Sequence, residues 1–513
     1  MMRSLFKPAN RFFVWGASII GIIVSIFLSI WSITIDDVIN NDGIVYVRAA
    51  EFLSSGDWQA AITVYKWPFY PWLMMLVGDN VGISYKTAGH VLNTIFFSFV
   101  VVFFIHTVRS FGGRSRLITL MALFIALAHP AFNEYRAFLI RDPGYLAAYL
   151  LAVYYFARYR WQPRGRYSSA AIASLVVASL FRIEGLVFLF AMPVLLLISH
   201  SRLTKWRWPR YLVSLLLVLI LGAVYGGYLL APIDGSTALL IAEEPIRVFG
   251  EGWGQIRAGV TGKLSVLEQE FLGPYSSDYS YLLFALTVLT VFALSIVAEL
   301  AIPYTALIGY GLFRRALFND QQLQRLWLGL ILINGIVLVA FALIMLFLAP
   351  RYPLAMVITL LITAPFILER LIKDIQKSEI RKLGSAFLII CFLWGIGESY
   401  SGVTNFGRNF HLRDAGYWLH TKTVNTSGPI LTNNRRIAYY TSVLGNREVL
   451  TMSGQALLEF SDFVDELGSD YAGIRIQRSD DLLEFELNKA MKSAPVKIFD
   501  NNHGDRVLLY DLR

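Results

Sequence analysis

Acidic and basic side chains gather in the segments that flank long apolar runs of this 513-residue sequence. Asp36, Asp37 and Asp42 follow the first run, and Lys66 precedes the aromatic and proline motif WPFYPW. A carboxylate can act as general base toward a hydroxyl group, and a lysine can bind the phosphate of an anionic lipid. The combination indicates chemistry at a membrane surface. The alternative is that these residues are solvated loop charges and interfacial anchors.

Other charged residues stand at the ends of further apolar runs. They are Glu134, Arg136, Arg141 and Asp142 in one segment, Arg182 and Glu184 in LFRIEGL, and Arg351 with Tyr352 in APRYPL. Charges near membrane depth are costly, so they tend to be functional or paired. Three structural alternatives stay open: Asp142 as a helix cap, a structural Arg182–Glu184 pair, and Arg351 reaching lipid headgroups.

Familiar catalytic motifs do not explain these residues. The sequence has no P-loop, GxGxxG, HExxH, GxSxG or CxxC arrangement in a credible context. Seven histidines and one cysteine disfavour a closed zinc site. The net charge of +9 comes from the flanks of apolar runs and does not indicate nucleic acid binding.

Composition places the charged segments in a multi-pass membrane protein. Hydrophobic residues make up 56% of the chain and charged residues only 16%, against roughly 25% charged in soluble domains. The first run, 12–33, is long enough to cross about 30 Å of hydrocarbon. The apolar runs cover residues 12–33, 88–108, 117–128, 145–157, 170–180, 186–198, 211–230, 281–313, 326–348, 353–368 and 383–396.

Six clusters of lysine and arginine predict the orientation of these runs, because such clusters stay in the cytoplasm. They lie within residues 3–11, 109–116, 158–166, 202–210, 314–325 and 370–382. We therefore expect eleven helices, a cytoplasmic N-terminus and an outer C-terminus. The scheme needs a tight turn at 180–186 and a single crossing by 281–313, broken at Pro303.

The predicted architecture is a transmembrane domain, residues 1–404, followed by a small outer α/β domain, residues 405–513. Outer loops are expected at 34–86, 129–144 and 232–279, and residues 44–53 predict an amphipathic helix with Val45, Ala49 and Phe52 on one side. In the tail, the patterns predict helices at 413–422, 456–467 and 482–491, and strands starting at 430, 471 and 507.

The sequence resembles the polytopic GT-C glycosyltransferases, with the aminoarabinose-transferase and protein-mannosyltransferase-like group as the nearest type. The resemblance is carried by DGIVY from residue 42, AAEFLSSGDW from 49, YKWPFYP from 65, LFRIEG and APRYPL. It continues through Glu134 and Asp142, and through RDAGYWL from 413 and NNRRIAYY from 433 in the tail.

This resemblance implies transfer of a sugar from a polyprenyl-phosphate donor to an acceptor on the non-cytoplasmic side, usually with inversion. It implies Asp42 as the base, with Asp36 or Asp37 as the second choice, and Lys66 near the donor phosphate. Val45 stands where some members have an arginine, which Arg48 is a candidate to replace.

For the second loop, the resemblance implies Asp142 or Glu134 as an acid, and substrate contacts for the arginines, Glu184 and Tyr352. No cofactor is required by it. A divalent cation, Mg²⁺ or Mn²⁺, held by Asp42 and Asp142 is left open.

Other functions are compatible with the same residues. A transporter or flippase of polyprenyl-linked sugars would explain the helices and arginines, but it predicts inverted repeats that the sequence does not show. A glycan polymerase or ligase would share the lipid-linked donor, and a non-catalytic envelope assembly protein would tolerate loss of Asp42. The resemblance places the chain in a bacterial inner membrane and leaves the sugar and the acceptor unnamed.

Overall fold

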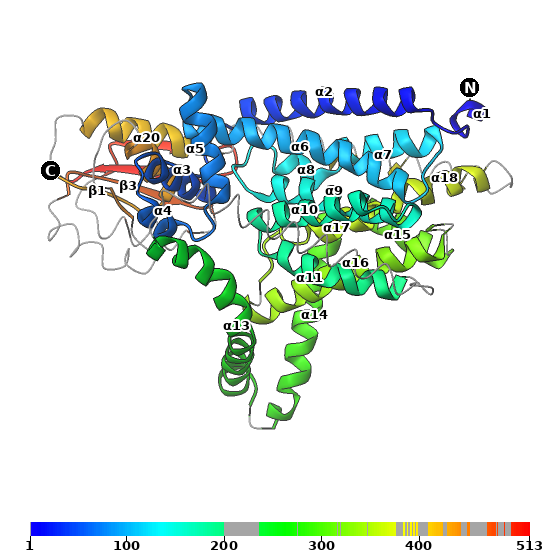
Figure 1. Cartoon of the computed structure of the whole chain (residues 1–513). Coiled ribbons are helices and arrows are strands. Elements are labelled where there is room, and N and C mark those ends of the chain that lie inside the picture. Colours follow the sequence, from blue (N-terminus) through cyan, green and yellow to red (C-terminus); the bar gives the residue numbers. More distant parts are fainter. Residues whose placement is uncertain are drawn as a thin grey trace.

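A computed structural model describes residues 2–199, 235–375, 409–423, 428–442, 449–451, 469–480 and 494–513, with single positions missing, and scattered positions within 383–398 and at 487. It has a body of packed helices and, at one end, a unit built around a β-sheet (Figure 1).

Within the described residues, five helical segments are long and apolar enough to cross a membrane: Arg11–Ile35, Tyr85–Ser110, Ser277–Leu300, Gln321–Met345 and Leu354–Lys373. The chain is a multi-pass membrane protein. Shorter apolar helices occur at Arg116–Ala128, Gly165–Phe181 and Ile302–Phe313. The expected run at 211–230 lies outside the described residues, so the number of eleven helices stays a prediction.

Helices α2 (Arg11–Ile35), α6 (Tyr85–Ser110), α7 (Arg116–Ala128), α9 (Asp142–Trp161) and α10 (Gly165–Phe181) pack together and form the centre of the body. Phe104, Tyr149 and Phe156 are fully buried there. The short helix α1 (Met2–Leu5) precedes this group, and α11 (Glu184–Ser199) follows it. The tight turn expected at 180–186 is confirmed, because only two residues separate α10 from α11.

The segment expected as the first outer loop is largely helical. It contains α3 (Asn41–Ser54), α4 (Trp58–Val64) and α5 (Phe69–Val81). The buried face of α3 is formed by residues such as Tyr46, Ala50 and Leu53, whereas Val45 and Phe52 are only half-buried. The helix predicted at 44–53 therefore exists, and of the three residues predicted on one side only Ala49 is fully buried where the helix packs on α4 and α5.

Two other expectations need correction. The predicted loop 232–279 contains the long helix α13 (Gly235–Val266), followed by the turns η1 (Leu267–Phe271) and η2 (Ser277–Tyr279). The run 281–313 is broken at Ala301, where φ is +63°, between α14 (Ser280–Leu300) and α15 (Ile302–Phe313). Pro303 lies in the first turn of α15, a position that tolerates proline, so the break precedes it.

The rest of the body comprises α8 (Pro130–Glu134), α16 (Gln321–Met345), α17 (Leu354–Leu361) and α18 (Ala364–Ile375). Helices α13 and α14 lie side by side and protrude from it (Figure 1). Both contact α16, and Leu264, Phe284 and Leu338 share a small apolar core.

The C-terminal unit holds a five-stranded sheet in the order β2-β1-β3-β5-β4. The strands are β1 (Ile430–Thr432), β2 (Val449–Thr451), β3 (Tyr471–Ile476), β4 (Lys497–Asp500) and β5 (Arg506–Asp511). The first three strands are parallel, and β5 runs antiparallel to β3 and β4. Helices α20 (Phe410–Thr423) and α21 (Arg435–Ser442) complete the described part, while the helices expected at 456–467 and 482–491 lie outside it, Leu487 apart.

Candidate active site

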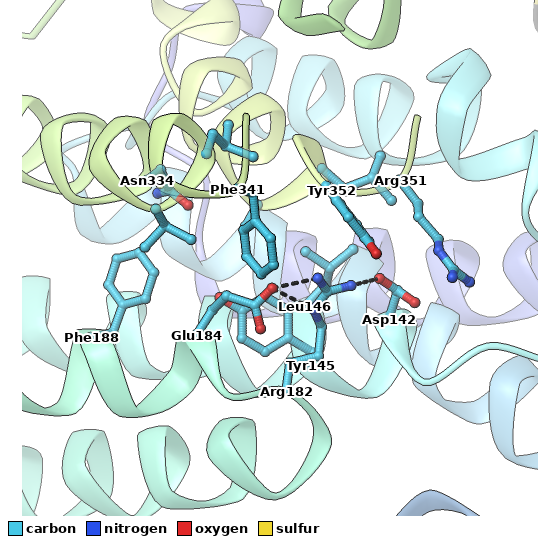
Figure 2. A pocket seen from close by; sticks show the side chains of 14 residues that line it. Asp142, Tyr145, Leu146, Arg182, Glu184, Phe188, Asn334, Phe341, Arg351 and Tyr352 are labelled. Carbon is cyan, nitrogen blue, oxygen red and sulfur yellow. Dashed lines mark hydrogen bonds and ion pairs between the residues drawn. The ribbon is translucent and has the colours of Figure 1, made fainter. Parts of the chain in front are cut away.

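A pocket lies where the start of α9, the α10–α11 turn, α16 and the start of α17 meet (Figure 2). Its lining combines charged residues with aromatic and aliphatic ones. The residues are Asp142, Tyr145, Leu146, Arg182, Glu184, Phe188, Asn334, Val337, Leu338, Phe341, Arg351, Tyr352, Leu354 and Ala355. Five residues that the sequence singled out therefore come together here: Asp142, Arg182, Glu184, Arg351 and Tyr352.

Arg182 occupies the centre of a buried ionic triad. One of its terminal nitrogens pairs with Asp142, and its Nε donates to Glu184 Oε1 at 3.0 Å. The guanidinium also lies over the rings of Tyr145 and Tyr352, at 5.8 and 5.1 Å from their centres. The three charged residues are all less than 10% exposed. Because buried charges need this kind of pairing, the triad is a fixed element of the pocket with a net charge of −1.

The triad decides between the sequence-based alternatives for its members. Asp142 begins α9, but Arg141 is the residue in the N-cap position, and the Asp142 carboxylate turns to Arg182. A role for Asp142 as N-cap is therefore wrong. Burial opposes the charge on Arg182, but Glu184 and Asp142 outweigh it and raise the pKa of Arg182 well above its ordinary value.

Arg351 connects the pocket to the first outer segment. Its guanidinium forms an ion pair with Asp42, which lies in the first turn of α3. The side chains are 25% and 35% exposed, so this pair is open to exchange with a ligand. Burial tends to lower the pKa of Arg351, but Asp142 and Asp42 outweigh burial and raise it. Arg351 is thus paired with a carboxylate of the first predicted loop and is influenced electrostatically by a carboxylate of the second.

Asn40 fixes the two loops against each other. Its Nδ2 donates to the carbonyl of Leu139 at 3.1 Å, and its Oδ1 accepts the Leu139 N–H at 2.8 Å. Asn40 lies two residues before Asp42, and Leu139 lies three before Asp142. These two hydrogen bonds therefore fix the positions of Asp42 and Asp142 relative to each other.

The alternative bases do not face the pocket. Asp37 pairs with Arg413 at 2.7 Å and lies 3.7 Å from Lys86. Asp36 accepts a hydrogen bond from Asn409 at 2.8 Å, and burial raises its pKa despite that bond. Of the three candidate bases Asp36, Asp37 and Asp42, only Asp42 pairs with a residue that lines the pocket.

Arg136 does not fit its predicted role as a substrate ligand. It is 1% exposed and donates from Nε to Asn133 at 2.9 Å and from a terminal nitrogen to Ser29 Oγ at 3.0 Å. The same nitrogen donates to the backbone and hydroxyl oxygens of Ser25, and the guanidinium lies over the ring of Phe97. Arg136 therefore fixes the second loop to α2.

The remaining predicted residues lie outside the pocket lining. Lys66, Arg48 and Glu134 are exposed, and Arg48 lies over the ring of Phe52. Arg141 is nearer, with its guanidinium 5.6 Å from the centre of the Tyr65 ring. Their substrate-binding or acid roles stay predictions.

Sequence reasoning missed Tyr145 and Asn334. Tyr145 follows Asp142 by three residues on α9, so helical spacing places both on one face. Asn334 interrupts an apolar run, and its Nδ2 donates to the Tyr149 hydroxyl at 3.2 Å. That hydroxyl lies 2.8 Å from Thr359 Oγ1. This buried polar network supports the floor of the pocket.

A divalent cation at Asp42 and Asp142 would compete with the arginines that these carboxylates bind. Across the described residues, no three His, Cys, Asp or Glu side chains gather in a way that could hold a metal ion. Asp42 and Asp142 each face a guanidinium group. A cation bridging them would have to displace both arginines.

Comparison with protein-family models finds no match, and comparison with curated proteins finds none either. Among solved structures, the apo oligosaccharyltransferase of Archaeoglobus fulgidus is similar, with a TM-score of 0.54. The two proteins are 12% identical, and the match covers 90% of this chain and 70% of that chain. The chain has the GT-C fold.

Two further solved proteins are similar at lower scores. ArnT from Cupriavidus metallidurans in the apo state is 12% identical, with a TM-score of 0.41 over 96% of this chain and 98% of its own. The arabinofuranosyltransferase AftD from Mycobacteria is 12% identical, with a TM-score of 0.48 over 99% of this chain and 42% of its own. The GT-C fold assignment rests on the archaeal structure.

The GT-C fold of this chain confirms the resemblance predicted from the sequence. The pocket therefore lies within a GT-C fold. Two carboxylates from separate segments each pair with an arginine of the pocket, Asp42 with Arg351 and Asp142 with Arg182. Such an arrangement can bind an anion at the arginines and remove a proton at a carboxylate.

Proposed function

We propose that this chain is a membrane glycosyltransferase that moves a sugar from a polyprenyl-phosphate donor to a hydroxyl acceptor on the extracytoplasmic side. One observation carries the proposal. On a GT-C fold, one pocket is lined by Asp142, Arg182 and Arg351, and Asp42 from a separate segment pairs with Arg351 at this pocket. The acceptor belongs to the cell envelope and is a glycan, a lipid or a protein.

Asp42 is the proposed general base. It is 35% exposed at its side chain, so an acceptor hydroxyl can reach it from solvent. The acceptor oxygen attacks the anomeric carbon, its proton passes to the Asp42 carboxylate, and the bond from that carbon to the phosphate oxygen breaks. The electron pair leaves with the phosphate, and attack opposite to it inverts the anomeric centre.

Arg351 is the proposed ligand of the donor phosphate. Negative charge grows on the phosphate as the glycosidic bond breaks, and a fixed guanidinium stabilises that charge. Arg351 is the more accessible of the two pocket arginines, because Arg182 is only 5% exposed and already holds two carboxylates. Arg182 offsets part of the negative charge of Asp142 and Glu184 and fixes Asp142.

Asp142, with its carboxylate held at Arg182, is the proposed second acid of the site and faces the sugar. Arg141 and Lys66 are proposed as peripheral cations that guide the donor headgroup toward Arg351. This assignment follows the predicted substrate-binding roles, and neither residue is needed for the proton transfer.

The proposed orientation puts the pocket and the C-terminal unit outside the cytoplasm of a bacterial inner membrane. The chain has a single cysteine, Cys391. In a Cys391→Ser background, a cysteine introduced at the exposed Asn502 should react with a membrane-impermeant maleimide added to intact spheroplasts. Labelling of Asn502→Cys only after lysis would reverse the orientation.

The test of activity uses purified protein in liposomes that contain an undecaprenyl-phosphate-linked, radiolabelled monosaccharide and envelope acceptors. We expect label to move into the acceptor fraction with release of undecaprenyl phosphate. Arg351→Ala should weaken binding of undecaprenyl phosphate about 10- to 100-fold, the usual loss for a hydrogen bond to a charged group. A flippase would instead move the intact labelled lipid between leaflets and form no new bond, which would refute the proposal. A parallel arm with a lipid-linked oligosaccharide distinguishes a transferase of single sugars from a glycan ligase.

A further inference from the structure

The five residues between α2 and α3 have no regular secondary structure. Residues 36–40 end two positions before Asp42, so their path determines where α3 starts. Ile39 is 1% exposed, and a buried backbone group outside a helix or strand must find a partner elsewhere. Much of what residues 36–39 bind comes from the C-terminal unit, whose residues follow them by more than 370 positions.

Tyr440 of α21 supplies the central contact. Its hydroxyl accepts the Ile39 N–H at 2.9 Å and donates to the Asp37 carbonyl at 3.4 Å. Tyr440 is 2% exposed and packs with the apolar core of the helical body, although its helix belongs to the C-terminal unit. The Lys86 ammonium lies 3.5 Å from the hydroxyl, 5.7 Å from the ring centre, and also binds the Asp37 carbonyl.

Charged and polar side chains of α20 and its flank strengthen this contact. Arg413 donates to the Asp37 carboxylate at 2.7 Å, and Asn409 donates to Asp36 at 2.8 Å. Arg436 in turn donates to Asn409 at 2.9 Å. The C-terminal unit thus binds the side chains of residues 36 and 37 as well as the backbone of residues 37 and 39.

We propose that Tyr440 is a positioning residue for the reaction: through the backbone of residues 37–39, it holds Asp42 where the carboxylate meets Arg351. This inference rests on the proposed function and deepens it. Asn40 fastens the following residue to the second loop, so the segment is clamped on both sides immediately before Asp42. The C-terminal unit thereby takes part in catalysis without touching the substrate.

The discriminating variant is Tyr440→Phe, which keeps the ring and its packing and removes only the hydroxyl. The matched control is Tyr439→Phe, the same loss on the neighbouring residue of α21, whose ring lies 5.2 Å from that of Tyr440. Three measurements are compared in the full-length protein: kcat and KM for sugar transfer, Kd for undecaprenyl phosphate, and amide hydrogen exchange of peptides covering residues 36–41.

For Tyr440→Phe we expect kcat to fall about 10- to 100-fold, the cost of a small misplacement of a catalytic group. The Kd for undecaprenyl phosphate should not rise, and it should fall by at most about fivefold, because Arg351 and Arg182 are untouched while a misplaced Asp42 competes less for Arg351. Exchange at residues 36–41 should accelerate about tenfold, since the Ile39 N–H loses its acceptor. Tyr439→Phe should change none of the three.

Two results would overturn the inference. One is unchanged exchange at residues 36–41 in Tyr440→Phe. The other is accelerated exchange with wild-type kcat, which would mean that the segment does not position the base. Failure of the proposed function looks different, because wild-type protein would then transfer no sugar from any polyprenyl-phosphate donor, while the exchange measurement still decides whether Tyr440 holds the segment.

Discussion

Replacing Asp42 by asparagine should affect donor binding and turnover in opposite directions. Asp42 pairs with the guanidinium of Arg351, which is the proposed phosphate ligand. A donor phosphate must therefore displace the carboxylate, and this displacement also frees the carboxylate to act as a base. Asparagine keeps the shape of the side chain but neither competes for Arg351 as an anion nor accepts the proton.

The size of both effects can be worked out from the structure. The two side chains are 25% and 35% exposed, which places the ion pair near the upper end of the range for accessible pairs, about 1 kcal/mol. Removing this competitor should tighten binding of undecaprenyl phosphate about fivefold. Loss of the general base should lower turnover about 10²- to 10⁴-fold.

The assay combines equilibrium binding of undecaprenyl phosphate in detergent with transfer of labelled sugar under saturating donor. Asp37→Asn is the matched control, because Asp37 also sits in an accessible pair with an arginine, but with Arg413 and away from the pocket. The control should leave the lipid affinity unchanged. The reasoning is refuted if Asp42→Asn binds the lipid no more tightly than wild type, or if it retains full turnover while Asp37→Asn loses it.

Three further outcomes are expected. Arg182→Gln should lower the free energy of unfolding by about 3–5 kcal/mol, because Asp142 and Glu184 would be left buried without a cation. Thermal unfolding in detergent measures this change, and an unchanged unfolding temperature would contradict the buried triad. The C-terminal unit should lose stability as the pH falls from about 6.5 to 4. Burial and then Arg475 lower the pKa of His411 to about 4, so the unfolded chain takes up a proton at a higher pH than the folded one does. His411→Leu should flatten this pH dependence of stability, and an equal dependence in both proteins would argue against a role of His411. If Mg²⁺ or Mn²⁺ binds at Asp42, Arg351→Ala should bind the metal more tightly than wild type does. Calorimetry with the metal alone would detect this, and the absence of binding to either protein would refute a metal site at Asp42.

Local patterns predicted the helices well because each apolar run is a property of neighbouring residues. The run 88–108 lies within α6, and the short link between 180 and 186 became the turn that carries Arg182. The break at Ala301 was missed by two residues, since a left-handed alanine has no sequence signature comparable to proline. Similarly, charge and polarity marked the first outer segment as unusual but did not show that it folds into three helices.

The site itself could be predicted only as a set of candidates. Asp42, Asp142 and Arg351 are far apart in the chain, and only tertiary packing shows that the first and last form a pair. Spacing could not separate Arg182, which lines the pocket, from Arg136, which is bound to α2. The contact between Ile39 and Tyr440 spans the whole body of the chain and leaves no periodic signal.

The short helix α7 constrains how the protein enters the bilayer. With 13 residues it is about 20 Å long, less than the thickness of the hydrocarbon layer. The irregular chain from Tyr135 to Arg141 that follows is sheltered by protein, and one terminal nitrogen of Arg136 donates to the hydroxyls of Ser25 and Ser29 in the second half of α2. Irregular backbone and a buried guanidinium are not tolerated in lipid alone. The loop after α7 can therefore reach its final packing only once α2 is in place, because Ser25 and Ser29 supply the hydrogen-bond partners of the Arg136 guanidinium.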